Sequence, residues 1–309
     1  MKRFLIIGFG NIGYRHFQGI YNKNNEYVII DKVFSNNLKH ISKNYKNVFM
    51  YKQISQNLKK FDLCIVSTNS KERYKILNQI ISFNLAKNII LEKILFSNLL
   101  DYSKAKKIKK KKIWVNCLNR NYPVYKKFLK KNKNKNFTKI EVIGSNWGMF
   151  CNFIHYIDLM YSFNNNTNYV VKKFEVSRPF PSKRAGYNEF YGEVILEFEN
   201  GSQIFFSCKR KKNIDLKVGI YLGSKLKLLV DEINGTAIFY ANNNKLKKKI
   251  YIPYLSQFSK DNVKKIFKGN LPELIDFKNA IKLHEPMIKS LSNHLSNISK
   301  KKVNEVNIT

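Results

Sequence analysis

The chain has 309 residues, of which 44% are hydrophobic, and includes 23 Phe and 18 Tyr. This length and composition exclude a disordered chain and are sufficient for two domains with buried cores. The net charge of +36 comes from 50 Lys and only 7 Arg. Because these lysines are spread along the whole chain, we interpret the charge as a compositional bias rather than as a specific nucleic-acid site.

The four cysteines lie far apart and form no C-x-x-C pair. This spacing argues against a structural zinc site and a disulfide framework, so we expect no metal and a reducing compartment. No run of 18 apolar residues occurs, and glycines soon interrupt the apolar run after Met1. We therefore expect no membrane span, no signal peptide and a cytoplasmic location. The densest lysine run, residues 104–112, is expected to be a solvated helix face and loop.

Short apolar strands alternate with amphipathic helices in the first third of the chain. The strands are expected at 3–8, 26–31, 47–50, 61–67, 88–92 and 112–117. The helices are expected at 11–22, 36–44, 53–59, 70–84 and 97–110. This alternation predicts an α/β fold, with residues 1–118 forming a Rossmann domain around a doubly wound parallel sheet.

Strands dominate the remainder of the chain. They are expected at 137–144, 169–178, 189–199, 202–210, 214–221, 225–231, 236–241 and 248–252, with hairpin turns at Asn200-Gly201 and Asn234-Gly235. A helical segment is expected at 120–136, with the Lys/Asn-rich residues 130–136 as a loop, and further helices are expected at 151–163 and 271–299. Residues 119–309 are thus predicted to be an α+β domain with a large, mainly antiparallel open sheet. Its C-terminal helices are expected to pack back toward the first domain.

A glycine-rich turn follows the first predicted strand. Gly8, Gly10 and Gly13 have G-x-G-x-x-G spacing, and Asn11 and Ile12 lie between the last two. The first glycine permits a tight turn, the second lets a pyrophosphate approach the backbone, and the third lets the helix pack on the sheet. The helix N-terminus favours the phosphates. These five residues are predicted to bind a dinucleotide; the alternative is an ordinary strand–helix turn.

An acidic residue ends the second predicted strand. Asp31 lies 18 residues after Gly13, close to the offset of about 20 residues at which a carboxylate binds the ribose hydroxyls. A carboxylate repels a 2′-phosphate and so favours NAD over NADP. The adjacent Lys32 acts in the opposite direction, which leaves NADP open.

Small polar and charged residues follow the next strands. Ser67, Thr68 and Asn69 end the fourth strand and are expected to line the cofactor cleft, with Asn69 able to cap the next helix. Glu92 and Lys93 end the fifth strand, and Glu92 is a further candidate for cofactor binding. Lysine at this position is suited to donate a proton or a hydrogen bond to a reacting oxygen.

Asn119 and Arg120 follow the last predicted strand of the first domain. Both are candidates for substrate binding, because an arginine fork suits a carboxylate or phosphate. The alternative for Arg120 is a salt bridge between the domains, and the sequence leaves the two interpretations open.

The run at 146–158 carries the second candidate constellation. Helical spacing places Cys151, His155 and Asp158 on one face, where Asp158 is expected to orient the histidine. Histidine is suited to take a proton from a hydroxyl as hydride leaves carbon. Trp147, Asn152 and Asp158 are further candidates for substrate binding. Without other context, a structural role for His155 is the alternative.

The glycine turn, the pair Glu92-Lys93 and the helix with His155 and Asp158 resemble the glucose-fructose oxidoreductase/inositol dehydrogenase/rhizopine catabolism (Gfo/Idh/MocA) family. A Glu-Lys-Pro motif supplies the active-site lysine of that family, and an Asp-x-x-x-His-x-x-Asp helix supplies its histidine. The resemblance implies that Lys93 orients or protonates the reacting oxygen and that His155 is the acid/base. It also implies that the sheet of the second domain forms a dimer or tetramer face.

Two positions depart from the family pattern. Ile94 replaces the proline, which leaves the backbone at Lys93 less constrained, and Cys151 replaces the first aspartate of the helix motif. The sequence of this helix resembles that of a subgroup of the family that is associated with bacterial surface-polysaccharide biosynthesis.

The sequence therefore predicts an NAD(P)-dependent oxidoreductase that acts on a sugar, in particular a nucleotide sugar. One alternative is a catalytically silent dinucleotide-binding regulator or scaffold, which the cysteine departure motivates. A nucleic-acid-binding protein is a second alternative, and it is motivated by the charge alone.

Overall fold

A computed structural model describes residues 1–33, 36–110, 112–133, 135, 137–210, 214–241 and 244–308. The chain divides into two compact units. Unit 1 comprises Met1–Phe96, Asp101–Cys117 and Pro253–Ala280. Unit 2 comprises Ser97–Leu100, Leu118–Ile252 and Ile281–Thr309. Each unit is therefore assembled from segments that are separated in the sequence.

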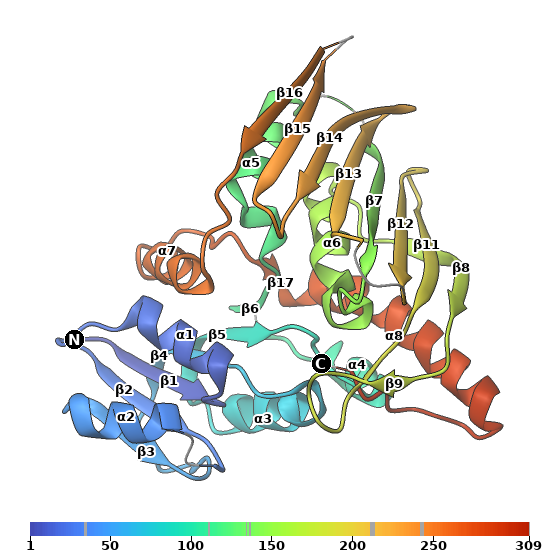
Figure 1. Cartoon of the computed structure of the whole chain (residues 1–309). Coiled ribbons are helices and arrows are strands. Elements are labelled where there is room, and N and C mark those ends of the chain that lie inside the picture. The colour runs from blue at the N-terminus through green and yellow to red at the C-terminus, as the bar shows by residue number, and fades with distance from the viewer. Residues whose placement is uncertain are drawn as a thin grey trace. The chain divides into compact units, whose positions relative to one another are not determined.

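The sheet of unit 1 uses the apolar segments of the first third of the chain. Its strands are β1 (Arg3–Ile7), β2 (Glu26–Ile30), β3 (Val48–Tyr51), β4 (Phe61–Val66), β5 (Ala86–Glu92), β6 (Ile113–Asn116) and β17 (Ile275–Asp276). They lie in the order β17-β6-β5-β4-β1-β2-β3, and all pairs are parallel except β17 with β6 (Figure 1). The order reverses between β1 and β4, which is where doubly wound sheets bind ligands. The predicted Rossmann-type fold is confirmed.

The helices of the same region follow the strands. They are α1 (Asn11–Ile20), α2 (Asn36–Asn44), α3 (Ser70–Ser82), α4 (Leu99–Ala105) and, much later in the chain, α7 (Leu255–Phe267). Gly19 allows α7 to approach α1 closely, because a Cβ at this position would lie 2.1 Å from the carbonyl oxygen of Ser256.

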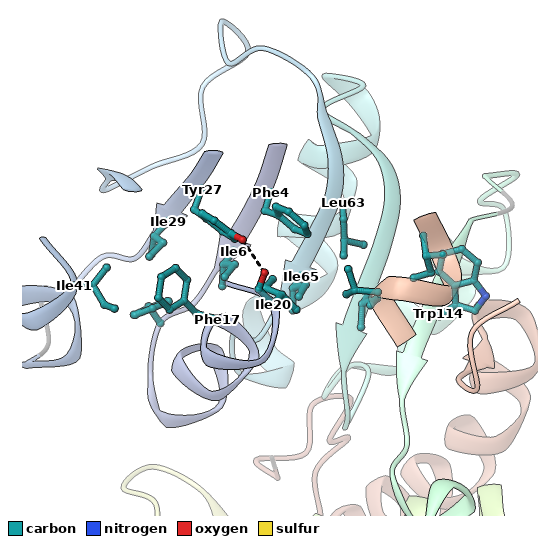
Figure 2. Close-up of a cluster of buried hydrophobic side chains, with 14 of the residues drawn as sticks. Phe4, Ile6, Phe17, Ile20, Tyr27, Ile29, Ile41, Leu63, Ile65 and Trp114 are labelled. Carbon is teal, nitrogen blue, oxygen red and sulfur yellow. Dashed lines mark hydrogen bonds between the residues drawn. The ribbon is translucent and has the colours of Figure 1, made fainter. Parts of the chain in front are cut away.

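One hydrophobic core joins the sheet of unit 1 to α1, α2 and α7 (Figure 2). Phe4 and Tyr27 stack at 5.0 Å between ring centroids, and the Tyr27 hydroxyl donates to the carbonyl of Ile20 over 2.7 Å. Val263 and Ile266 of α7 belong to the same core. Burial of such side chains contributes about 1.5–3 kcal/mol each, so α7 is part of the stability of unit 1.

The described residues of unit 2 form an eight-stranded sheet. Its strands are β7 (Phe137–Ser145), β8 (Tyr169–Val176), β11 (Gly192–Phe198), β12 (Gln203–Lys209), β13 (Lys217–Leu222), β14 (Lys225–Asp231), β15 (Thr236–Ala241) and β16 (Asn244–Lys249). They lie in the order β16-β15-β14-β13-β7-β12-β11-β8, and only β7 and β12 pair in parallel. The predicted, mainly antiparallel sheet is confirmed. Gly201 and Gly235 have φ values of 78° and 60°, as the predicted hairpin turns require.

Further elements of the second half are η1 (Asn119–Asn121), α5 (Pro123–Lys131), α6 (Met149–Asn164), α8 (Phe277–Ser299) and the short hairpin of β9 (Phe180–Pro181) and β10 (Asn188–Glu189). Helix α6 packs on β7 and β12. Along β7, buried Ile140 and Val142 alternate with half-buried Glu141 and Ile143, so one face of the sheet is covered and the other is more open. None of the described helices is long and apolar enough to cross a bilayer.

Strand β16 forms one edge of this sheet and is exposed along its whole length. Four of its six residues are lysines, at positions 245, 247, 248 and 249. It pairs with β15 from Asn244 opposite Ala241 to Lys249 opposite Thr236. The strand predicted at 248–252 thus lies at 244–249 instead. Its position follows from backbone pairing with β15 and not from the apolar residues after it.

The predicted helix at 53–59 is wrong. This segment is a turn in which the Ser55 carbonyl accepts from the Leu58 N–H and the Ser55 hydroxyl accepts from the Asn57 N–H. Serine side chains compete in this way with helical hydrogen bonds. Residues 106–110 of the lysine run also lie outside any helix, and Lys111 lies outside the described residues. Positions 134 and 136 of the segment predicted at 120–136 also lie outside the described residues, and the described remainder of that segment contains the end of η1 and α5.

Candidate active site

The glycine turn connects β1 to α1, and its three glycines have different surroundings. Gly8 has a φ of 86°, and a Cβ at this position would lie 2.7 Å from the backbone nitrogen of Thr68. A Cβ at Gly13 would lie 2.1 Å from the Gly8 carbonyl oxygen. A Cβ at Gly10, by contrast, would meet no described atom within 4 Å. The turn is therefore closed at Gly8 and Gly13 and open at Gly10, where a ligand has to approach.

The start of α1 suits an anion. Gly10 is its N-cap and provides no side chain to occupy the first-turn N–H groups, and the described first turn contains no acidic residue. Asn11 and Ile12 are exposed there, Ile12 with 41% of its surface. Unpaired N–H groups and the positive end of the helix dipole favour a phosphate at such a position.

Asp31 lies beside this turn. One of its carboxylate oxygens accepts from the Phe9 N–H over 2.5 Å and the other from the Val33 N–H over 3.0 Å. Each carboxylate oxygen has a second lone pair for a ribose hydroxyl. The neighbouring Lys32 ammonium lies 3.6 Å from a carboxylate oxygen of Glu72, so part of the positive charge that favoured NADP is offset locally.

The segment after β4 closes the other side of the turn. The Ser67 hydroxyl donates to the Gly8 carbonyl over 2.6 Å, and the Asn69 side chain caps α3 by accepting from the Glu72 N–H over 3.1 Å. These contacts fit the capping alternative for Asn69. The buried Oγ1 of Thr68 has no hydrogen-bond partner among the described residues. A dinucleotide fits this cradle, because it would fill the space at Gly10 and provide a partner for Thr68.

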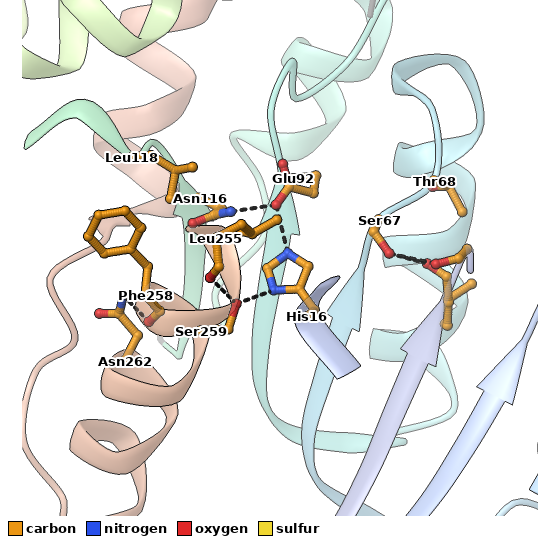
Figure 3. A network of polar contacts seen from close by, with 12 residues as sticks. His16, Ser67, Thr68, Glu92, Asn116, Leu118, Leu255, Phe258, Ser259 and Asn262 are labelled. Atoms are coloured by element: carbon orange, nitrogen blue, oxygen red, sulfur yellow. Dashed lines mark hydrogen bonds and ion pairs between the residues drawn. The ribbon is translucent and has the colours of Figure 1, made fainter. Parts of the chain in front are cut away.

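A buried polar network surrounds Glu92 at the end of β5 (Figure 3). His16 Nε2 lies 2.8 Å and Asn116 Nδ2 2.5 Å from the same carboxylate oxygen. His16 Nδ1 lies 2.7 Å from the Ser259 hydroxyl, which donates to the Leu255 carbonyl. Burial alone would raise the pKa of Glu92, but the combined effects of His16, Asn116 and Arg73 outweigh it and the pKa is lowered. Glu92 is therefore held as a carboxylate by residues from three segments of unit 1.

Lys93 follows Glu92 directly and is half-buried. Ile94, at the position where the resemblance expects proline, is buried, and the peptide bond between the two residues is cis. Lys93 belongs to unit 1, whereas His155 belongs to unit 2.

In unit 2, the imidazole of His155 faces the segment before η1. The Leu118 N–H donates to His155 Nδ1 over 3.2 Å. Because Nδ1 is the acceptor in this contact, the neutral ring carries its proton on Nε2. The ring therefore presents an N–H donor at its other nitrogen.

Asp158 is paired with Arg120. The arginine Nε and Nη2 donate to the two carboxylate oxygens over 2.6 and 2.5 Å. Burial raises the pKa of Asp158 to about 6, against the opposing effect of Arg120. Arg120, a candidate for substrate binding or for a salt bridge between the domains, thus binds a carboxylate of its own unit. This carboxylate is the one that was expected to orient His155.

The other substrate-binding candidates of unit 2 have structural contacts. Trp147 is 8% exposed and donates from Nε1 to the Ser207 carbonyl over 3.1 Å. The Asn152 amide donates to the Trp147 carbonyl over 2.9 Å. The Asn119 amide donates to Glu232 over 3.2 Å. A direct role of these residues in substrate binding stays a prediction.

Sequence reasoning did not single out Glu232. Its carboxylate accepts from the hydroxyls of Tyr125 and Tyr156 over 2.6 and 3.1 Å, in addition to the Asn119 amide. Burial raises the pKa of Glu232 although these hydrogen bonds oppose the shift. The three donors come from η1, α5 and α6, so Glu232 connects the helix that carries His155 to η1 and α5. Their separation in the sequence gave no signal of this contact.

Comparisons with known proteins agree with this geometry. Residues 2–116 match the model of an oxidoreductase family with an NAD-binding Rossmann fold. No curated protein matches the chain. Among solved structures, UDP-N-acetylglucosamine 3-dehydrogenase from Acidithiobacillus ferrooxidans is similar with a TM-score of 0.69 at 11% identity, over 94% of this chain and 96% of that one.

Two further structures are similar over nearly their whole length. Myo-inositol dehydrogenase from Lactobacillus casei, solved with NAD(H) and myo-inositol, has a TM-score of 0.66 at 13% identity and covers 95% of each chain. A dehydrogenase from Clostridium difficile has a TM-score of 0.68 at 17% identity, over 95% of this chain and 99% of that one. At such identities the likeness extends to the fold alone. The match over residues 2–116 assigns the N-terminal part of this chain to the NAD-binding Rossmann fold of the Gfo/Idh/MocA oxidoreductase family.

Proposed function

We propose that this protein is an NAD-dependent oxidoreductase that transfers a hydride between the nicotinamide ring and a hydroxyl-bearing carbon of a sugar, and that the sugar is nucleotide-linked. The observation that carries the proposal is the dinucleotide cradle of unit 1, with open space at Gly10 and Lys93 at the end of β5. The similar folds of a UDP-sugar dehydrogenase and an inositol dehydrogenase support the substrate class. A role in bacterial surface-polysaccharide biosynthesis belongs to the same proposal.

Binding of the cofactor is assigned to the glycine turn, Asp31 and Thr68. The first-turn N–H groups of α1 would receive the pyrophosphate, and Asp31 would bind the adenosine ribose. When bound, the cofactor supplies the hydride chemistry. NAD is favoured over NADP, because the carboxylate of Asp31 would repel a 2′-phosphate.

Proton movement is assigned to Lys93 and His155. When the alcohol is oxidised, its carbon loses a hydride and its oxygen loses a proton. His155 carries its proton on Nε2 while Leu118 occupies Nδ1, so this nitrogen is arranged to donate a hydrogen bond to the oxygen. Lys93 is then assigned the proton that the oxygen loses, and it returns this proton to the oxygen in the reverse direction.

The test is turnover of a panel of UDP-sugars with NAD or NADP by the purified protein and four variants. Lys93→Met removes the proton carrier and is expected to lower kcat by about 10²–10⁴-fold, the usual contribution of a general acid–base group. His155→Gln keeps an N–H donor and is expected to retain more activity than His155→Ala. Lys59→Met, at an exposed site of unit 1, is the control and is expected to match the wild-type protein.

Three outcomes of this test contradict the proposal. Equal activity of His155→Gln and His155→Ala would overturn the donor role of His155. Wild-type turnover that Lys93→Met leaves unchanged would overturn the assignment of Lys93. Tight NADH binding without turnover of any sugar would favour the catalytically silent alternative, which Cys151 motivates.

We also propose that the protein associates with itself through the open face of the unit 2 sheet. The register places Ile238, Leu229, Gly219, Glu141 and Phe205 in one row across five adjacent strands of that face. Three of these side chains are apolar and half-buried in the single chain, and a sheet of this kind is suited to cover them with a second copy. A dimer or tetramer in light scattering that Phe205→Lys dissociates is expected, and a monomeric wild-type protein would overturn this proposal.

A further inference from the structure

Arg73 carries a buried positive charge that the proposed reaction does not use. It lies in α3 and is only 1% exposed. Burial of a guanidinium is costly unless its donors are bonded. Nη1 donates to the carbonyl of Ile94 and, over 3.2 Å, to that of Leu95, and Nη2 donates to the carbonyl of Thr68. The side chain therefore joins two loops that follow different strands.

Both loops belong to the candidate active site in unit 1. Thr68 follows β4 and lies against the glycine turn, as the 2.7 Å approach of its nitrogen to a Cβ at Gly8 shows. Ile94 and Leu95 come directly after Lys93. A single guanidinium thus connects a wall of the cofactor cradle to the backbone that carries the lysine.

Lys93 consequently lies between two fixed points. On its N-terminal side, Glu92 is held by His16 and Asn116. On its C-terminal side, the next two carbonyls are held by Arg73. The charge of Arg73 also contributes to the lowered pKa of Glu92, after burial and the His16 and Asn116 contacts. The family pattern has a proline at position 94, and a proline would restrict the backbone there. Isoleucine does not, and the hydrogen bonds from Arg73 restrict the same backbone instead.

We propose that Arg73 is a positioning residue that fixes the Lys93 backbone relative to Thr68 and the glycine turn. This inference rests on the proposed function for the catalytic role of Lys93. Arginine is required because its planar fork presents several N–H donors in fixed directions, whereas a lysine ammonium is a point donor on a flexible stem. Misplacement of a reacting group by about 1 Å costs roughly 10²-fold in rate.

The test compares Arg73→Lys and Arg73→Met with Lys75→Met, which removes an exposed charge from the same helix. Arg73→Lys is expected to lower kcat by roughly 10²-fold, with the sugar KM changed less than about threefold, because the lysine is displaced while substrate contacts remain. Amide hydrogen exchange at 93–96 is expected to accelerate in both Arg73 variants, while exchange in β1 and β4 stays as in the wild type.

Hydrogen exchange and NADH titration separate this inference from the proposed function, because neither needs turnover. If the wild-type protein turns over no sugar, the proposed function fails, while faster exchange at 93–96 in Arg73→Lys still supports the positioning role. Folded Arg73→Lys and Arg73→Met proteins with wild-type exchange at 93–96 would overturn it. So would a general loss of protection across β1 and β4 to the same extent as at 93–96, which would indicate a purely structural role.

Discussion

Substitution of Gly10 by alanine is expected to separate cofactor binding from folding. Gly10 has φ and ψ of −70° and −164°, which alanine adopts without strain. A Cβ there meets no described atom within 4 Å. Alanine is a poorer N-cap than glycine, but it also lowers the entropy of the unfolded chain. The two effects are each about 0.5–1 kcal/mol and oppose one another, so the free energy of unfolding should change by less than about 1 kcal/mol.

The same methyl group occupies the space through which a pyrophosphate would approach the backbone. We expect the Kd for NADH to rise about 10- to 100-fold, which corresponds to about 1.4–2.7 kcal/mol. NADH fluorescence titration measures the affinity, and urea denaturation of the same samples measures stability.

Gly13→Ala is the matched comparison. Its Cβ would lie 2.1 Å from the Gly8 carbonyl oxygen, so the turn and α1 must separate, and overpacking of this kind costs about 1–3 kcal/mol. We therefore expect Gly13→Ala to lose both stability and NADH binding, and Gly10→Ala to lose binding alone. A Gly10→Ala protein that binds NADH within twofold of the wild type would refute the assignment of this turn to the cofactor.

Two further predictions concern buried acids. The pKa of Asp158 is raised from 3.8 to about 6 by burial, so between about pH 4 and pH 6 the unfolded chain ionises this group while the folded one keeps its proton. The free energy of unfolding should therefore fall by about 3 kcal/mol as the pH rises from about 4 to about 6. Asp158→Asn should abolish this pH dependence in urea titrations, and an unchanged dependence would contradict the burial argument. His16→Leu leaves Glu92 without its imidazole partner and should cost about 3–5 kcal/mol, whereas His16→Leu combined with Glu92→Gln should cost less, and equal losses would exclude coupling of the two.

The first half of unit 1 was predictable because its information is local. Apolar runs such as 61–67 and the G-x-G-x-x-G spacing determine strand, turn and helix within a few residues. The same holds for the Asn-Gly hairpins of unit 2. Position alone also placed Asp31 beside the glycine turn, because the carboxyl ends of adjacent parallel strands meet at one edge of the sheet.

The sequence did not predict in this way which polar side chains contact one another. Helical spacing correctly placed His155 and Asp158 on one helix, but the choice of Arg120 as partner for the acid depends on how η1 packs against α6. Arg73 finds its acceptors 21 and 22 residues later in the chain, and His16 finds Ser259 at a separation of 243 residues. Helix α7 was not predicted, although its buried Leu255, Phe258, Val263 and Ile266 recur at helical spacing.

The lysine-rich edge strand β16 has a consequence for how this protein meets other copies of itself. An exposed strand edge offers unpaired N–H and C=O groups to any chain that aligns beside it. Here every approaching copy would bring four ammonium groups against four others at the spacing of neighbouring strands, where like charges repel. Continuation of the sheet through β16 from one molecule into the next, the first step toward fibrous aggregates, is thereby opposed at this edge.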